Sequence, residues 1–145
     1  MKEINEFKII EYNPVLFEQV NKFWNETNLG GSYRGDSATI ISNTLKAGGH
    51  LPILINSDNE VIGTSWLTND KRRTYIHHFG IKKEYRNKGL ATFLLQHCIK
   101  LANEDGYQVK LEVHKDNATA IKLYQNFGFK YLGDYEVMIK RESGV

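Results

Sequence analysis

The sequence predicts an α+β (mixed α/β) fold in which a mostly antiparallel sheet is flanked by helices. The middle of the chain alternates apolar segments with short polar turns, which is typical of antiparallel hairpins. The second half then runs strand, loop, helix and strand, an order that packs a helix against a sheet. With 145 residues, no repeat and no change of composition along the chain, the sequence predicts one domain over residues 1–145.

The first half predicts a strand and two helices. After the strand, apolar residues recur at about helical spacing, and Gly, Asn and Pro mark the ends of the elements. The strand covers residues 7–12, and Asn13 and Pro14 open the first helix. Gly30 and Gly31 form a break. The second helix follows, capped by Asp36 or Ser37 and ended by Gly48 and Gly49.

Strands and turns fill the middle of the chain, and helices alternate with strands after it. The middle elements are strands over residues 51–56, 61–67 and 74–81, with turns over 57–60 and 69–73. The later elements are a helix from Gly89 to Asn103 that Gly106 follows, a strand over 109–114, a helix over 117–128, and a strand, turn and strand over 129–141. The helix that starts at Gly89 has one apolar stripe, in which Cys98 is predicted to be a core residue without a nucleophilic role.

Composition and charge exclude several classes of protein. The formal net charge is +2, too near balance to indicate a nucleic-acid binder. One cysteine leaves no internal disulfide, and no Cys/His spacing typical of a metal site occurs. No apolar run reaches the roughly 18 residues of a membrane span, and the first residues carry charges that the core of a signal peptide lacks. We therefore expect a cytoplasmic protein without a membrane partner or a metal.

A basic loop precedes the helix that starts at Gly89. Its cations are Lys82, Lys83, Arg86 and Lys88. The first amides of a helix have no intrahelical acceptor, the helix dipole is positive there, and a glycine lets an anion approach the backbone. Neither the P-loop pattern nor the GxGxxG fingerprint occurs. On these residues alone, an anion site and a solvated loop both remain open.

Two motifs in the second half resemble one known family. Residues 86–91, RNKGLA, match the pattern Q/R-x-x-G-x-G/A, and residues 117–129, NATAIKLYQNFGF, match N-x-x-A-x-x-L-Y-x-x-x-G-F. With both motifs in order and a strand between them, the chain resembles the GNAT superfamily of N-acetyltransferases. The resemblance implies a splayed central sheet with about four helices, acetyl-CoA as co-substrate, and direct transfer of the acetyl group to a primary amine in a ternary complex.

The resemblance also implies which residues bind acetyl-CoA. The basic loop and the helix start would hold the pyrophosphate, and the end of the strand over 74–81 would pair its backbone with the pantetheine arm. That strand is expected to separate from the strand over 109–114, so that acetyl-CoA fills the gap. The implied residues are Phe79, Gly80, Ile81, Arg86, Asn87, Lys88, Gly89, Leu90, Ala91, Thr92, Asn117 and Tyr124.

Glu112 and Tyr124 are the catalytic residues that the resemblance implies. The stretch LEVHKDNATAIKLYQNFGF is similar to that of the ribosomal-protein N-terminal-alanine acetyltransferases, in which the glutamate is the general base and the tyrosine the general acid. The residues themselves leave alternatives open. Tyr124 has the spacing of a core aromatic residue, and Glu112 that of a strand carboxylate paired with a nearby cation.

His77 and His78 are rival candidates for the general base, because a neutral imidazole can remove a proton near pH 7. Adjacent residues of a strand face opposite ways, so one of the two is expected to face the acceptor. Histidines of this strand serve some amine acetyltransferases of the superfamily, which keeps both open beside Glu112.

The sequence does not name the acceptor. The resemblance implies a pocket built by residues 24–36 and 132–135, with Tyr33, Arg34, Asp36 and Tyr135 as contacts. A small-molecule amine and a protein N-terminus both remain open as acceptors. Residues 71–73 are read as a solvated turn, or as charges that steer an acidic acceptor.

Other possibilities concern the protein as a whole. A non-catalytic acyl-CoA-binding sensor or regulatory module is the alternative to an enzyme, and the presence of both Glu112 and Tyr124 favours the enzyme. A nucleic-acid partner is not expected, since Tyr85 is the only aromatic residue among the cations of the basic loop. The strand edges of the predicted final hairpin suggest a homodimer.

Overall fold

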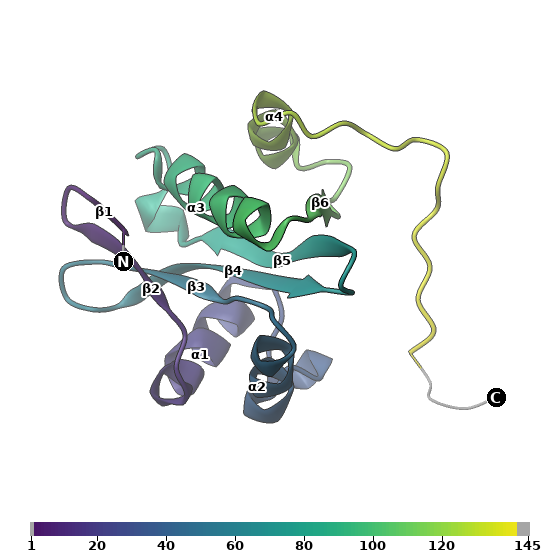
Figure 1. Ribbon diagram of the computed structural model, residues 1–145. Coiled ribbons are helices and arrows are strands. Elements are labelled where there is room, and N and C mark those ends of the chain that lie inside the picture. Colours follow the sequence, from purple (N-terminus) through teal and green to yellow (C-terminus); the bar gives the residue numbers. More distant parts are fainter. Residues whose placement is uncertain (1, 142–145) are drawn as a thin grey trace. The chain divides into compact units, whose positions relative to one another are not determined.

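The computed structural model describes residues 2–141 of the chain. These residues fall into two units, one up to Glu112 and one from Val113 onward (Figure 1). The prediction of a single domain over residues 1–145 stays a prediction.

The first unit is built on a six-stranded sheet whose strands lie side by side in chain order. The strands are β1 (Lys2–Ile4), β2 (Phe7–Glu11), β3 (Pro52–Ile55), β4 (Val61–Asn69), β5 (Arg73–Ile81) and β6 (Gln108–Leu111). Neighbouring strands are antiparallel except β5 and β6, which are parallel and connected through a helix (Figure 1). The predicted mixed α/β fold with a mostly antiparallel sheet is confirmed.

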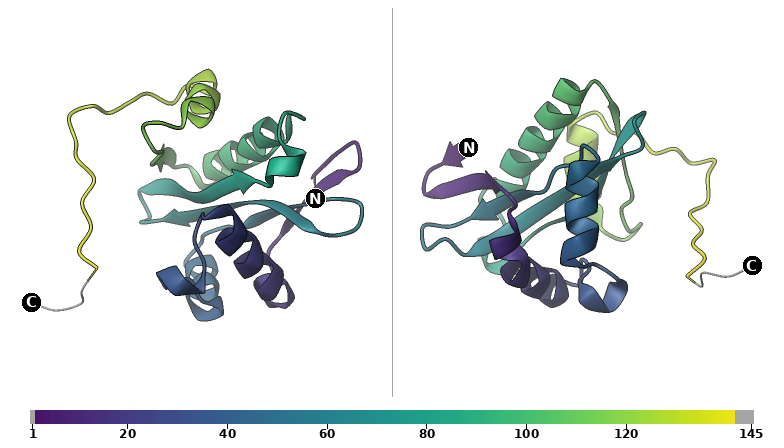
Figure 2. Two further views of the ribbon diagram at one scale, coloured as in Figure 1. Left: turned by 180° about the vertical axis from the view of Figure 1, so that it is seen from behind. Right: turned by 60° about the horizontal axis from the view of Figure 1, so that its bottom comes forward.

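Helices cover both faces of this sheet (Figure 2). α1 (Phe17–Thr27) and α2 (Ala38–Lys46) lie on one face, and α3 (Leu90–Asp105) lies on the other. Short 3-10 helices in the loops are η1 (Pro14–Leu16), η2 (Ser32–Arg34) and η3 (Lys83–Tyr85). The side chain of Asn13 caps η1, and the Ser37 hydroxyl accepts the amide of Ile40 at the start of α2. Of the two predicted caps for α2, Ser37 is therefore the one that acts.

Two buried groups of apolar side chains hold the helices on the sheet. The cluster that joins α1 and α2 to the sheet contains Tyr12, Val20, Phe23, Trp24, Ile41, Leu51, Ile53, Ile55, Val61 and Trp66. On the other face, α3 buries Leu90, Leu94, Leu95, Cys98 and Ala102. Burial raises the pKa of the Cys98 thiol to about 12, so the thiol stays protonated near neutral pH. The prediction that Cys98 belongs to the core is confirmed.

Two strands of the first unit differ from the prediction. β1 is an additional short strand, and Asn5, at φ 52°, turns the chain from β1 into β2. β6 ends at Leu111, whereas the sequence predicted a strand as far as residue 114. β5 carries a bulge beyond Ile76, and a bulge bends its strand and interrupts the ladder, so β6 loses its pairing partner there.

The second unit contains α4 (Ala118–Asn126), which confirms the predicted helix. The Asn117 side chain caps it by accepting the amide of Ala120. A turn lies at Gly133 and Asp134, as predicted, but residues 129–141 form no strand. The two strands predicted on either side of this turn are therefore wrong. A strand needs a hydrogen-bonding neighbour, and none pairs with these residues within the described chain. Their large apolar side chains are exposed, namely Tyr131, Leu132, Tyr135, Val137, Met138 and Ile139.

The homodimer was expected from the strand edges of that final hairpin. Since residues 129–141 form no strands, this basis is absent from the described chain. The dimer stays a prediction, and sedimentation of the purified protein tests it directly.

Candidate functional site

The basic loop before α3 has a backbone suited to an anion. Asn87 and Gly89 both lie in the left-handed region, at φ 63° and 78°, and Gly89 caps α3. Left-handed residues among right-handed ones can turn successive N–H groups toward one side. Within residues 2–141, no amide from residue 87 to residue 92 donates to a protein acceptor. A Cβ on Gly89 would meet no atom within 4 Å, so the space beside this glycine is open.

The cations of the basic loop differ in how they are held. Arg86 is tied to the end of β5, because its Nε donates to the carbonyl of Ile81 at 3.2 Å. Lys83 and Lys88 are exposed. The loop thus offers backbone donors with exposed positive charge around them, which is a suitable arrangement for a phosphate group.

β5 is paired with β6 over only its first part. The ladder between them ends at Ile76 and Leu111, whereas β4 pairs with β5 as far as Ile81. Beyond Ile76, His78 and Gly80 have no ladder partner on the β6 side within residues 2–141. The predicted separation of these strands is therefore present, and it leaves backbone groups of β5 open to an extended ligand.

A β-bulge in β5 places both histidines on the sheet face that carries α1 and α2. The ladder between β4 and β5 shifts register between Thr64 and Trp66, and His78 has φ 46°. Trp66 lies opposite His77, and the ring of His78 meets that of Trp66 edge-on at 5.4 Å. The expectation that the two histidines face opposite ways is wrong, because the extra residue of the bulge breaks the alternation.

His78 is held by a carboxylate from the loop between α1 and α2. Its Nε2 lies 2.8 Å from Asp36 Oδ2, which also accepts the amide of Gly31 at 2.7 Å. The two side chains are 21% and 15% exposed, so water screens the pair only partly. The sequence suggested Asp36 as a helix cap or an acceptor contact. Ser37 caps α2 instead, and Asp36 fixes the imidazole of His78.

Two tryptophans that no pattern in the sequence indicated surround this pair. The rings of Trp24 and Trp66 stack 5.3 Å apart, and Trp24 also meets the His78 ring edge-on at 4.7 Å. The indole N–H of Trp24 donates to Thr64, whose hydroxyl donates to the carbonyl of His78. The sequence contains only two tryptophans, one in a helix and one in a strand, but nothing in their spacing links them to His78.

Gly30 is the residue that lets Asp36 reach His78. A Cβ at position 30 would lie 2.4 Å from both Asp36 Oδ2 and His78 Nε2. We expect Gly30→Ala to break this hydrogen bond and to destabilise the fold by about 1–3 kcal/mol through overpacking. The ¹⁵N resonances of the His78 imidazole report the loss, and Asp36→Asn should change the same resonances. Gly133→Ala, in the second unit, is the control, and unchanged imidazole signals in Gly30→Ala would contradict the assignment.

Glu112 is the last residue of the first unit and lies just beyond β6. It is exposed, and no cation of residues 2–112 forms an ion pair with it, so the alternative of a paired strand carboxylate finds no support in its own unit. Glu112 does lie within electrostatic range of His77.

Desolvation lowers the pKa of His77 below 6.5, the charge of His78 lowers it further, and the carboxylates of Glu112 and Asp36 oppose this shift. His77 is therefore mostly neutral at pH 7, and its Nε2 lies 2.8 Å from the Thr68 hydroxyl.

The second unit carries the predicted acid. Tyr124 is 7% exposed on α4, and its ring lies 5.7 Å from that of Phe129. This burial fits the interpretation of Tyr124 as a core aromatic residue and leaves its acid role a proposal. Asn117, the predicted pantetheine contact, uses its side-chain oxygen as the cap of α4.

The remaining predicted contacts lie on exposed segments. Tyr33 and Arg34 both donate to Asn28 Oδ1, at 3.0 and 2.8 Å, so they stabilise the loop that follows α1. Tyr135 is exposed in the second unit. The turn over residues 69–73 is closed by Asp70, whose carboxylate accepts the amides of Arg72 and Arg73. This supports the interpretation of a solvated turn.

Within residues 2–141, no helix combines the length and the apolar character that crossing a bilayer requires. The same part of the chain has no cluster of three or more His, Cys, Asp or Glu residues arranged to hold a metal ion.

Comparison with known proteins adds evidence of a different kind. The family model described as "Acetyltransferase (GNAT) family" matches residues 17–129. N-alpha-acetyltransferase 50 of Danio rerio is 32% identical over 74 residues, which are 50% of this chain and 44% of that protein. The chain spans about half the length of the curated relatives it matches.

Solved structures share the fold. A GNAT-family acetyltransferase of Staphylococcus aureus Mu50 has a TM-score of 0.76 and 27% identity, covering 90% of this chain and 89% of its own. Arabidopsis thaliana Naa50, solved in complex with the bisubstrate analogue CoA-Ac-MVNAL, has a TM-score of 0.73 and 19% identity, covering 87% and 84%. At 19% identity, the similarity to the Arabidopsis protein shows a shared fold alone.

Proposed function

Because the chain belongs to the GNAT acetyltransferase family, we propose that it transfers the acetyl group of acetyl-CoA directly to a primary amine in a ternary complex. The observation that carries the proposal is the run of amides without protein acceptors, from residue 87 to residue 92, at the start of α3. Next to it, β5 ends with an edge that β6 does not pair. A pyrophosphate joined to an extended chain of amides has groups that match both features.

We assign the parts of acetyl-CoA to residues accordingly. The amides of residues 87–92, with Arg86 and Lys88, bind the pyrophosphate, while residues 79–81 and Asn117 bind the pantetheine arm. When bound, acetyl-CoA supplies a thioester whose carbonyl carbon the amine attacks. The fold shared with Arabidopsis Naa50, which was solved with a CoA-containing bisubstrate analogue, supports this assignment.

Proton transfers are assigned to Glu112 and Tyr124. An alkylammonium group with a pKa near 10 has no lone pair for attack, so a base must remove its proton, and the leaving thiolate needs an acid. We propose Glu112 as the base and Tyr124 as the acid. Support comes from the exposed carboxylate of Glu112 beyond the end of β6 and from the position of Tyr124 within the matched motif. His77 is the rival base, because it is neutral at pH 7 and lies within electrostatic range of Glu112.

The acceptor is proposed to approach from the sheet face that carries α1 and α2, where both histidines and Asp36 lie. A protein N-terminus is one candidate, supported by the likeness to Naa50, whose bisubstrate analogue contains the peptide MVNAL. A small-molecule amine is the other, supported by the restricted exposure of the His78 and Asp36 side chains.

Release of free coenzyme A thiol from acetyl-CoA tests the proposal. The protein is assayed against amines, polyamines, amino acids and short peptides with free N-termini, beside Tyr124→Phe. We expect amine-dependent thiol release that falls about 100-fold in Tyr124→Phe and is unchanged in the control Tyr131→Phe, whose ring is exposed. Tight binding of acetyl-CoA without release for any acceptor would overturn transfer and favour a non-catalytic acyl-CoA sensor.

A further inference from the structure

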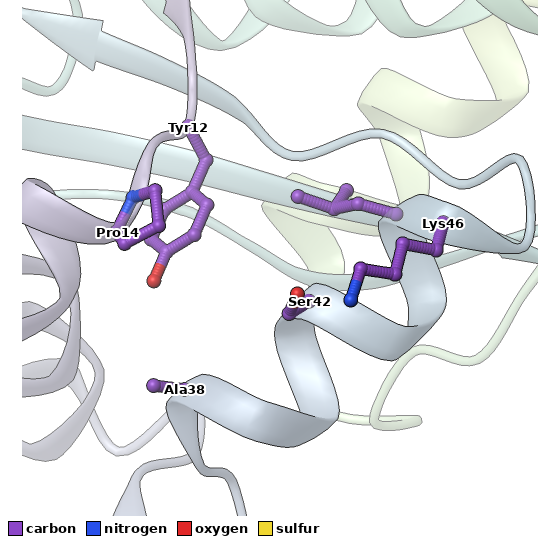
Figure 3. A pocket seen from close by; sticks show the side chains of 6 residues that line it. Tyr12, Pro14, Ala38, Ser42 and Lys46 are labelled. Carbon is purple, nitrogen blue, oxygen red and sulfur yellow. The ribbon is translucent and has the colours of Figure 1, made fainter.

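A cavity of about 300 Å³ lies between α2 and the segment that follows β2 (Figure 3). The residues that line it are Tyr12, Pro14, Ala38, Ser42, Leu45 and Lys46. Its volume is at the lower end of the range for small-molecule sites, roughly 300–1,000 Å³, so it suits a small metabolite rather than a coenzyme.

The hydroxyl of Tyr12 is the feature that points to a ligand. Tyr12 is only 9% exposed, and its hydroxyl has no hydrogen-bond partner within residues 2–141. Figure 3 shows this hydroxyl directed into the space between the labelled side chains. Burial raises the pKa of Tyr12 above 10, so the group is a hydrogen-bond donor near neutral pH. A buried donor without an acceptor is unfavourable for folding, which a ligand that supplies the acceptor would correct.

The other lining residues define the chemistry of that ligand. Lys46, the last residue of α2, is exposed, has no ion-pair partner within residues 2–141, and extends its nitrogen toward Ser42 in Figure 3. No acidic side chain is among the six lining residues, so the charge favours an anion. Pro14, Ala38 and Leu45 make the rest of the wall apolar.

The cavity is separate from the candidate functional site. Ala38, Ser42, Leu45 and Lys46 follow one another at helical spacing and form one stripe of α2. Thr44 lies on a different stripe, where its hydroxyl accepts the indole N–H of Trp66 at 2.9 Å. α2 therefore has one stripe toward the cavity and another toward the tryptophan that contacts His78.

We propose that this cavity is a second small-molecule site, which binds a monocarboxylate with a compact apolar body and holds the carboxylate between the Tyr12 hydroxyl and the Lys46 ammonium group. One cation and two hydroxyls match the single charge of a carboxylate. The apolar wall takes the body of the ligand out of water.

Titration of the ¹⁵N-labelled protein with benzoate and with hexanoate tests the site. We expect the amides of Ala38, Ser42 and Lys46 to shift in a saturable manner, and those of residues 87–92 to stay in place. Tyr12→Phe and Lys46→Met should each weaken binding about tenfold, while Lys100→Met, an exposed lysine of α3, should leave it unchanged. Benzamide, the neutral counterpart of benzoate, should bind at least about tenfold more weakly.

The site is overturned if no lining amide shifts at millimolar benzoate or hexanoate, if benzamide binds as tightly as benzoate, or if both variants bind like the parent protein. Tyr12→Phe removes only a hydroxyl without a partner, so its fold should be retained, and the unperturbed amides of the same spectra check this. Binding is observed directly here, so the result does not depend on whether the protein transfers acetyl groups.

Discussion

Glu112→Gln is expected to lower kcat for amine acetylation by about 100-fold or more, the usual contribution of a general base. Glutamine keeps the size of the side chain but cannot accept the proton of the ammonium group. The acidic limb of the pH–rate profile, which follows protonation of the base, should disappear with it. The KM for acetyl-CoA should stay unchanged, because Glu112 is not among the residues proposed to bind it. Steady-state kinetics between pH 5 and pH 9 provide the measurement.

Two variants sharpen this test. Glu104→Gln removes an exposed carboxylate of α3 and should behave like the parent protein. His77→Ala should retain the acidic limb if Glu112 is the base. The assignment is wrong if Glu112→Gln leaves both turnover and the limb unchanged while His77→Ala abolishes them. In that case the lowered pKa of His77 fits its role as base, since the imidazole is neutral and able to accept a proton at pH 7.

Trp24→Ala is expected to destabilise the first unit by about 3–5 kcal/mol, a large share of the 5–15 kcal/mol typical of a domain. Trp24 is fully buried, stacks on Trp66 and donates its indole N–H to Thr64 at 2.9 Å. Its removal leaves a cavity and a hydroxyl without its donor. Equilibrium unfolding in urea, monitored by circular dichroism, measures the loss.

Trp24→Phe separates packing from hydrogen bonding. Phenylalanine keeps an aromatic ring against Trp66 and His78 but has no N–H for Thr64, so we expect a smaller loss of about 1–3 kcal/mol. If Trp24→Ala costs less than about 1 kcal/mol, or no more than Trp24→Phe, then this tryptophan does not organise the region around His78.

The sequence predicted most of the secondary structure because its signals are local. The double glycine after α2, the caps at Asn13 and Ser37, and the polar turns between β3, β4 and β5 each act within a few residues. The loop before α3 was found for the same reason, since cations, a glycine and a helix start occupy one short stretch. Such signals can be recognised in the sequence without knowing which distant residues pack against these segments.

The parts of the site that were missed depend on distant residues. Asp36 and His78 are 42 positions apart, and no spacing rule connects them. The bulge in β5 could not be read from its sequence, because an alternating pattern fits a regular strand equally well until the pairing partner is known. The prediction for residues 129–141 was wrong for the same reason, because strands were predicted there from the local sequence and no neighbouring strand pairs with them within the described chain.

The order of strands in the sheet, which is the order of the chain, has a consequence for how the first unit is made. Each strand pairs with the one synthesised just before it, so sheet growth can follow the ribosome strand by strand, with short connections except between β2 and β3, where α1 and α2 intervene. β6 must wait as well, because its parallel pairing with β5 needs the crossover through α3. The loop before α3 lies inside that crossover, so the backbone that we propose to bind an anion is among the last parts of this unit to be fixed during biosynthesis.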